Sequence, residues 1–279
     1  MEQTEQPDPS LNPAGAINAT RSWRRVCELV GATSVRDAIG ATLLQVCELR
    51  SRRRAYGRHA NVILSGPAGS GRGEFARHYA AGLSELGLVP VGHLIRVTTG
   101  KELAPRWPGQ ARSLVQAALR DAEGGVLMID YSDDALGSGP DIMEQLVDLT
   151  RPKLGDPVIL LLGAAPELRE LRAAVPVLAE AFGQEWTMPD YSIPELADII
   201  VRHLVRRGHE VPDDVREALV DLAAGLPEGT VRAAHLLSMR LTGMAASRTL
   251  TLADLNGLAA RTTEGRVSAQ QHDGLAAVG

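Results

Sequence analysis

The chain has 279 residues, of which 44% are hydrophobic, 23% are charged and only 3% are aromatic, and its formal net charge is −5. This composition is typical of a globular protein, and the length allows one large domain with a smaller one. The negative net charge gives no general attraction to nucleic acid, and the scarcity of aromatic rings argues against a platform for stacked bases. We therefore expect no nucleic-acid partner.

The cysteine content and the apolar runs bear on the compartment. Two cysteines, Cys27 and Cys47, indicate neither a disulfide framework nor a metal cluster, which is typical of a reducing compartment. No apolar run approaches the roughly 20 residues that span a bilayer. The N-terminal stretch is acidic and polar and does not resemble a signal peptide. We expect a cytoplasmic protein with no membrane insertion.

Short apolar runs alternate with helical patterns over the first two thirds of the chain. Residues 1–20 are rich in Pro, Asn, Gln and Glu and are expected to be a disordered tail. The sequence predicts helices over 21–30, 33–49, 72–86, 110–122 and 142–149, and strands over 61–65, 93–97, 126–130, 158–162 and 185–188. Because the strand runs are continuously apolar, we expect an α/β fold in which helices cover both faces of a parallel five-stranded sheet.

After residue 189 the pattern is helical only, with helices predicted over 194–207, 213–224, 230–241 and 252–260. The sequence therefore indicates a small C-terminal helical domain. The expected organisation is a disordered tail over 1–20, a large α/β domain with N-terminal helices over 21–189, a small helical lid domain over 190–262 and a flexible tail over 263–279.

A glycine-rich loop joins the first predicted strand to the next helix. Its residues, continued into the helix, are Gly66, Pro67, Ala68, Gly69, Ser70, Gly71, Arg72, Gly73 and Glu74. The glycines match the phosphate-loop pattern, in which main-chain N–H groups at a helix N-terminus surround an anion. We interpret the segment as a cofactor-binding loop, with an ordinary glycine-rich turn as the alternative.

The side chains of this loop depart from the pattern. Arg72 stands for the Lys that bridges the phosphates, and its planar fork differs from a point charge. Gly73 stands for the Ser or Thr whose hydroxyl holds Mg²⁺. Glu74 adds a carboxylate that lowers the affinity for phosphate unless it turns away.

Six stretches carry a resemblance to a known family: 29–31, 59–66, 92–98, 103–110, 124–130 and 188–192. Together, over residues 28 to 260, they resemble the subclass of AAA+ ATPases that contains CbbX, stage V sporulation protein K and the type VII secretion protein EccA. The resemblance implies a P-loop AAA+ domain with a helical lid and ATP or ADP with Mg²⁺ as cofactors. It also implies a homo- or hetero-oligomeric ring with AAA+ partners that acts on a protein client.

The resemblance also implies roles for single residues. Trp107 stands where the family's pore loop offers an aromatic side chain to the substrate polypeptide, and its Pro- and Gly-rich surroundings indicate exposure. The alternative is a tryptophan packed on the sheet. Asp130 ends the Walker B strand and would orient water bound to Mg²⁺, a weak metal contact. Arg232 matches the sensor-2 arginine, with a surface helix arginine as the alternative.

Other groups that the family uses for hydrolysis are missing. Tyr131 replaces the Glu that positions the attacking water, and a phenol is a poor base at neutral pH. Asp133 and Asp134 lie nearby in sequence. The sensor-1 segment, 163–166, has no polar side chain. The alignment puts Ala181 at the position of the arginine finger, which is worth about 10³ to 10⁵ in rate.

Four groups of one reaction are thus replaced, at Arg72, Gly73, Tyr131 and Ala181. We expect an AAA+ ATPase-like nucleotide-binding module of a protein-remodelling or secretion-type machine, deficient in hydrolysis, that acts as a regulatory or scaffold subunit with nucleotide and Mg²⁺ binding weakened or absent. Two alternatives stay open. One is an active ATP-hydrolysing AAA+ chaperone with non-standard motifs, and the other is a nucleotide-free protein-interaction adaptor.

Overall fold

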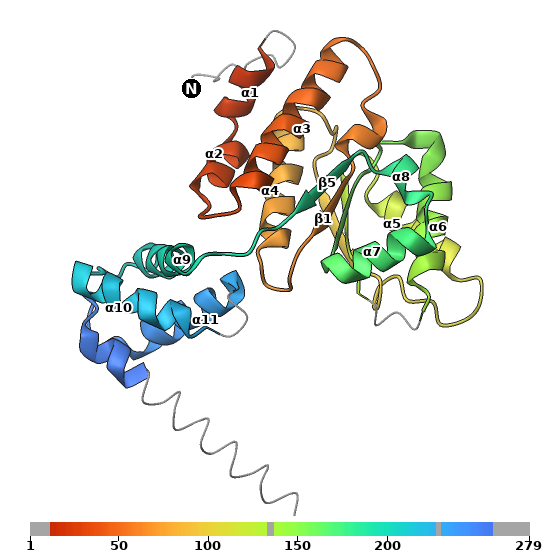
Figure 1. Cartoon of the computed structure of the whole chain (residues 1–279). Helices are drawn as coiled ribbons and strands as arrows, with labels where there is room; N and C mark the ends of the chain where they lie inside the picture. The colour runs from red at the N-terminus through yellow and green to blue at the C-terminus, as the bar shows by residue number, and fades with distance from the viewer. Residues whose placement is uncertain (1–11, 133–136, 227–229, 259–279) are drawn as a thin grey trace, which may run out of the picture. The chain divides into compact units, whose positions relative to one another are not determined.

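The computed structural model describes residues 12–132, 137–226 and 230–258. The chain divides into two compact units, Met1–Pro189 and Asp190–Gly279 (Figure 1). The division falls at the position where the sequence pattern changes from alternating strands and helices to helices alone.

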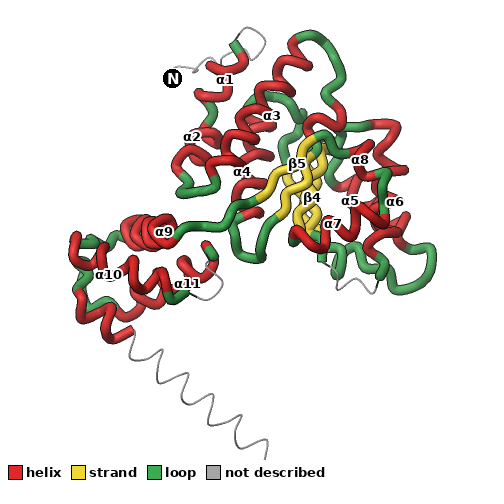
Figure 2. Tube along the Cα trace, viewed as in Figure 1, coloured by secondary structure: helices red, strands yellow, loops and turns green. Residues whose placement is uncertain are grey.

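A five-stranded sheet forms the centre of the first unit, in the order β2-β3-β4-β1-β5 with every neighbouring pair parallel. Its strands are β1 (Val62–Ser65), β2 (Leu94–Thr98), β3 (Val126–Asp130), β4 (Val158–Gly163) and β5 (Gln184–Thr187). Figure 2 shows the strands between two groups of helices. The predicted parallel sheet with helices on both faces is confirmed, and the burial of β1, β3 and β4 explains why their sequences are continuously apolar.

The two faces of the sheet are covered by different halves of the first unit (Figure 1). One face carries α1 (Pro13–Ala19), α2 (Arg21–Glu28), α3 (Thr33–Ser51) and α4 (Arg72–Glu85). The other face carries α5 (Ala111–Asp121), α6 (Gly139–Thr150), α7 (Ala165–Ala174) and α8 (Leu178–Ala181). Two short 3₁₀ helices, η1 (Gly57–Ala60) and η2 (Arg151–Lys153), lie in the connections.

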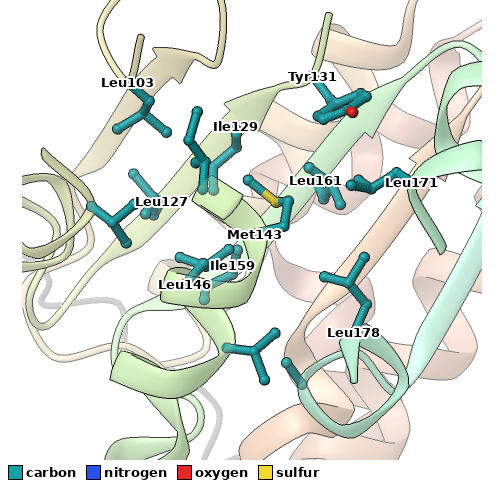
Figure 3. Close-up of a cluster of buried hydrophobic side chains, with 14 of the residues drawn as sticks. Leu103, Leu127, Ile129, Tyr131, Met143, Leu146, Ile159, Leu161, Leu171 and Leu178 are labelled. Atoms are coloured by element: carbon teal, nitrogen blue, oxygen red, sulfur yellow. The ribbon is translucent and has the colours of Figure 1, made fainter. Parts of the chain in front are cut away.

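A hydrophobic core lies between the sheet and the second group of helices (Figure 3). Leu127 and Ile129 of β3 point into this core. Because successive side chains of a strand point to opposite faces, Met128 and Asp130 lie on the other face, which α4 covers. Asp130, the polar residue at the end of β3, therefore lies on the face that α4 covers.

The expected disordered tail over 1–20 is wrong for the part that the structure describes. Residues 13–19 form α1, which begins at Pro13 after an N-cap at Asn12, whose side chain accepts a hydrogen bond from the Gly15 amide at 2.9 Å. Ala16 and Ile17 are buried, and α1 packs against α2 and α3. The tertiary contact of these two apolar side chains orders a segment whose composition predicts disorder.

The helix predicted over 33–49 is observed as α3, and it follows Ala32, which is in the left-handed conformation with φ 48° and makes no side-chain cap. One further detail differs from the sequence prediction. The helix α7 was not predicted, because Pro166 in its first turn reads as a loop residue although proline is tolerated there.

The second unit is helical. Its long helices are α9 (Ile193–Arg206), α10 (Asp213–Ala224) and α11 (Val231–Met244), and residues 252–258 are also helical. Ser192 and Glu195 form a reciprocal capping box at the start of α9. The expected flexible tail over 263–279 lies outside the described residues. No helix in the described ranges is both long and apolar enough to cross a membrane.

Asn61, the residue before β1, connects β1 to β4 and α8 through the hydrogen bonds of its side chain. Its side chain is fully buried, its Nδ2 donates to the Ala181 carbonyl at 2.9 Å, and its Oδ1 accepts from the Ile159 amide at 2.8 Å. It therefore satisfies one donor of β4 and one acceptor of α8 that have no access to water.

Asn61→Ala is expected to lower the free energy of unfolding by about 2 to 4 kcal/mol, because a buried amide and a buried carbonyl both lose their partner. Urea unfolding followed by circular dichroism measures this. The matched control is Asn18→Ala, an exposed asparagine on α1, which is expected to change stability by less than about 0.5 kcal/mol. Equal losses in the two variants would contradict the structural role of Asn61.

Candidate phosphate-binding site

Residues 66–73, here named the phosphate loop, leave the carboxyl end of β1 and lead directly into α4. Gly66, Gly69 and Gly71 have φ of 154°, 81° and 96°, which side-chain-bearing residues rarely adopt. A Cβ on Gly66 would lie 2.6 Å from Cβ of Met188, the residue after β5. The glycines are therefore required both for the path of the loop and for its close approach to the neighbouring strand.

The phosphate loop presents a set of main-chain donors. Within the described residues, no backbone acceptor pairs with the N–H groups of Gly69, Gly71, Arg72 and Gly73. The first N–H groups of a helix have no partner inside it, and the helix dipole is positive at this end. Together they form a site suited to an anionic oxygen, which is what phosphate supplies.

Glu74 turns away from this cradle. Its carboxylate forms ion pairs with Arg77 and with His78, one turn further along α4, the latter at 3.1 Å. Burial raises the pKa of Glu74, but the hydrogen bond and charge of Arg77 and the proximity of His78 lower it more, so the net pKa lies below its ordinary value. The carboxylate that the sequence places beside the phosphate loop therefore does not occupy it.

Arg72 begins α4, directly after the glycines of the phosphate loop, and its side chain is half-buried. Its Nη1 is buried and has no hydrogen-bond partner among the described residues. Burial lowers the pKa of Arg72, while the charges of Asp130 and Glu167 oppose this shift. An arginine stays protonated in a protein, so this nitrogen is a donor that lacks an acceptor.

Asp130, at the carboxyl end of β3, is held by an arginine from the neighbouring strand. Nε of Arg96 on β2 lies 2.5 Å from Oδ2 of Asp130. The Arg96 side chain is 54% exposed, whereas that of Asp130 is 24% exposed. This is a short, charge-assisted hydrogen bond with the Asp130 carboxylate as its acceptor.

The residues at this site do not fit Mg²⁺ well. Mg²⁺ prefers octahedral oxygen ligands, and the oxygen expected from a hydroxyl is absent because residue 73 is glycine. The one carboxylate at the expected position, Asp130, already accepts from Arg96. Across the described ranges, no three His, Cys, Asp or Glu side chains come together as a metal-ligand group.

Tyr131 belongs to the hydrophobic core. It is 8% exposed, and it lies in the cluster between the sheet and α5 to α8 (Figure 3). A Cβ on Gly139, at the start of α6, would lie 2.6 Å from its hydroxyl oxygen. The residue in the position expected for the water-orienting acid therefore packs against α6.

Ala181 is also a core residue, with 1% of its surface exposed, and its carbonyl accepts from Asn61. An arginine finger has to reach outward to a neighbouring subunit, so a buried position at the end of α8 is unsuited to one. The aligned position thus provides no such group.

Trp107 lies in the loop between β2 and α5 and is 60% exposed, in agreement with its turn-like sequence context. Its carbonyl accepts from the Gln110 amide at 3.3 Å, and the Gln110 side chain accepts from the Arg106 amide at 2.6 Å. These bonds fix the turn that presents the indole to solvent. The alternative of a tryptophan packed on the sheet is wrong, whereas contact with a client stays a prediction.

The remaining predicted residues lie elsewhere. Arg232 is the second residue of α11 in the second unit and is exposed, so its contact with a phosphate stays a prediction. Asp133 and Asp134 lie outside the described residues. The segment 163–166 ends β4 and starts α7, and the Gly163 carbonyl accepts from the Gly66 amide at 3.2 Å.

Two charged residues of the site were missed by the sequence analysis. Arg96 was predicted only as part of a strand. The signal for its role is an arginine two residues before the polar end of that strand. Glu167 lies in the first turn of α7, a helix that was not predicted. Both belong to the site through neighbours that are far apart in the sequence.

The fold and the site together define a P-loop α/β domain of the AAA+ type, followed by a helical unit. A scan against models of protein families finds no match. The chain is 24% identical to a CfxQ homolog of Galdieria sulphuraria in an alignment of 239 residues that covers 78% of each chain. It is 27% identical to CbbX of Cereibacter sphaeroides over 69% of this chain and 65% of CbbX.

Solved structures agree on the fold. The AAA domain of FIGL-1 in complex with ADP matches with a TM-score of 0.56 and 16% identity, over 81% of this chain and 74% of that chain. The chain therefore has the fold of an AAA+ protein and is similar in sequence to CfxQ and CbbX, so the resemblance inferred from its motifs is confirmed.

The Glu74 ion pairs predict a low carboxyl pKa that depends on Arg77. In an NMR titration, Glu74 is expected to titrate below the ordinary glutamate value of 4.5, and Arg77→Met is expected to raise its pKa. Because the folded-state pKa is depressed, the stabilisation by these pairs is present above the unfolded pKa and is lost as the pH falls through the folded pKa.

Arg151→Met is the control for this titration, because it removes an exposed arginine that pairs with Glu180 instead. It is expected to leave the Glu74 pKa unchanged. A Glu74 pKa at or above 4.5, or one that Arg77→Met does not move, would contradict the observed orientation of the carboxylate.

Proposed function

We propose that this chain is a nucleotide-binding AAA+ module that hydrolyses ATP poorly or not at all, and that it serves as a regulatory or scaffold subunit of a protein-remodelling or secretion-type machine. One observation carries the proposal: among the described residues several N–H groups of the phosphate loop have no backbone acceptor and Glu74 pairs with Arg77 and His78 instead, while Tyr131 is buried in the core. Binding uses the backbone, and hydrolysis uses side chains that this chain lacks.

ATP and ADP are the expected ligands, because the cradle supplies N–H donors in a row and Arg72 adds a buried donor that lacks an acceptor. Hydrolysis also requires a base or a residue that orients water at the γ-phosphate, and a phenol packed against α6 provides neither. Losing such a group lowers the rate by several orders of magnitude, so a low basal rate follows.

The partners follow from the homology. We propose an oligomeric ring, either of this chain alone or mixed with an active AAA+ protein, that acts on a protein client in the cytoplasm. Trp107 is the residue proposed to contact that client, because it is a large aromatic side chain held in solvent by a defined turn. An active partner would then provide the hydrolysis.

The isolated protein is expected to bind ADP and ATP in isothermal titration calorimetry and to release no phosphate above background in a coupled assay. Gly71→Ala is expected to weaken ADP binding by about tenfold or more. Residue 71 has a positive φ that alanine rarely adopts, so the variant cannot hold the amides at the start of α4 in place. Gly87→Ala is the matched control: it also has positive φ, with open space around it, but it lies beyond the far end of α4.

Each alternative function predicts a different result in these assays. Steady unaided release of phosphate, abolished by Asp130→Ala, would overturn the proposal in favour of an active ATPase. Absence of any nucleotide binding would overturn it in favour of a protein-interaction adaptor. Equal effects of the two glycine variants on ADP affinity would remove the phosphate loop as the binding site.

The role of Trp107 can be tested apart from nucleotide binding. Trp107→Ala is expected to change the free energy of unfolding by less than about 0.5 kcal/mol, because the side chain is exposed. It is also expected to reduce binding to an unfolded model polypeptide such as casein, measured by fluorescence anisotropy in the presence of ATP. Unchanged casein binding would exclude Trp107 as the client contact.

A further inference from the structure

Arg96 is positioned by the sheet itself to neutralise Asp130. β2 and β3 are parallel neighbours, with Arg96 opposite Met128 and Thr98 opposite Asp130. Since alternate residues share a face, Arg96 and Asp130 project from the same face, one diagonal step apart. The 2.5 Å contact between Nε and Oδ2 therefore joins two side chains on rigid strands.

This ion pair lies where the fold would otherwise bring a divalent cation to Asp130. A guanidinium already supplies a full positive charge to this carboxylate, and it does so without the ordered water shell that Mg²⁺ keeps. The second ligand that Mg²⁺ would need, a hydroxyl on residue 73, is missing. At this site Arg96 supplies the positive charge, and the metal lacks the hydroxyl ligand that residue 73 would otherwise provide.

A second guanidinium reinforces this arrangement. Arg72 is close enough to Asp130 and Glu167 for their charges to oppose the effect of burial on its pKa, and its Nη1 has no acceptor within the described residues. Arg72, Arg96, Asp130 and Glu167 therefore all lie near the carboxyl end of the sheet, where the phosphate loop also presents main-chain donors without a backbone acceptor among the described residues. A phosphate group that enters would be neutralised by guanidinium groups and amides.

We propose that Arg96 replaces the divalent cation of this site, so that the chain binds nucleoside di- and triphosphates as metal-free anions. The inference rests on the proposed function, since it requires that the phosphate loop binds a nucleotide. It adds a property that sequence homology does not predict, namely binding that is independent of Mg²⁺.

Calorimetry of the full chain with ADP, in excess EDTA and in excess MgCl₂, tests the inference. We expect the two affinities to agree within about twofold for the unmodified protein. Arg96→Met keeps an unbranched apolar stem but removes the guanidinium and its charge, and it is expected to weaken ADP binding in EDTA by about tenfold or more, the usual scale for loss of a charged phosphate contact.

The matched control is Arg112→Met. Arg112 forms an ion pair of similar geometry with Asp148, at 2.7 Å with its side chain 55% exposed, but it joins α5 to α6 on the opposite face of the sheet. This variant is expected to leave ADP affinity unchanged in both conditions. It therefore separates loss of the Arg96 charge from the general effect of removing a surface arginine.

A double variant tests whether the arginine and the metal are alternatives. A Cβ on Gly73 meets nothing within 4 Å, so the branch point of Gly73→Thr fits at this position, and the substitution supplies the missing hydroxyl. Combined with Arg96→Met it frees Asp130 and restores an oxygen ligand. We expect the double variant to bind ADP at least about tenfold more tightly with MgCl₂ than with EDTA.

The outcomes separate this inference from the proposed function. If the unmodified protein binds ADP only with MgCl₂, or if Arg96→Met has no effect in EDTA, the inference is overturned and nucleotide binding stands. If no nucleotide binds in either condition, the proposed function fails and the inference fails with it. Equal affinities in EDTA and MgCl₂, with a loss specific to Arg96→Met, support both.

Discussion

The main-chain N–H groups at the start of α4, which have no backbone acceptor in the described part of the chain, are the feature on which the rest of the site depends. They are held open by glycines with positive φ and by the close approach of Gly66 to Met188, where no side chain fits. A cradle built from backbone requires only this geometry and not a particular side chain. It can therefore persist in a chain whose Lys, hydroxyl and acidic positions hold Arg72, Gly73 and Tyr131.

The parallel sheet determines which charged residues lie near this cradle. Because all five strands run in the same direction, the carboxyl ends of β1, β3 and β4 meet at one edge. The register of β2 against β3 then brings Arg96 to Asp130, and α4 carries Arg72 to the same region. The positions of these charges follow from strand pairing, and the guanidinium of Arg96 pairs with the carboxylate at the end of β3.

Packing explains why the positions associated with hydrolysis could change without loss of the fold. Tyr131 and Ala181 are both buried in the core between the sheet and α5 to α8, where they fill space. Each contributes to the stability of the first unit through burial, which is independent of any catalytic role. The fold of the first unit thus depends on the burial of these two residues, whether or not the chain hydrolyses ATP.

The sequence by itself determined the parallel sheet, the glycine loop that enters α4 and the change to helices after residue 189, because apolar period and glycine content are local properties. It also determined that an acid, a hydroxyl and a lysine are missing. Only the tertiary structure decided that Glu74 turns towards Arg77, that Arg96 pairs with Asp130, that Tyr131 is buried and that residues 13–19 are helical. The direction of a side chain depends on all its neighbours, and burial depends on elements distant in sequence that local patterns do not encode.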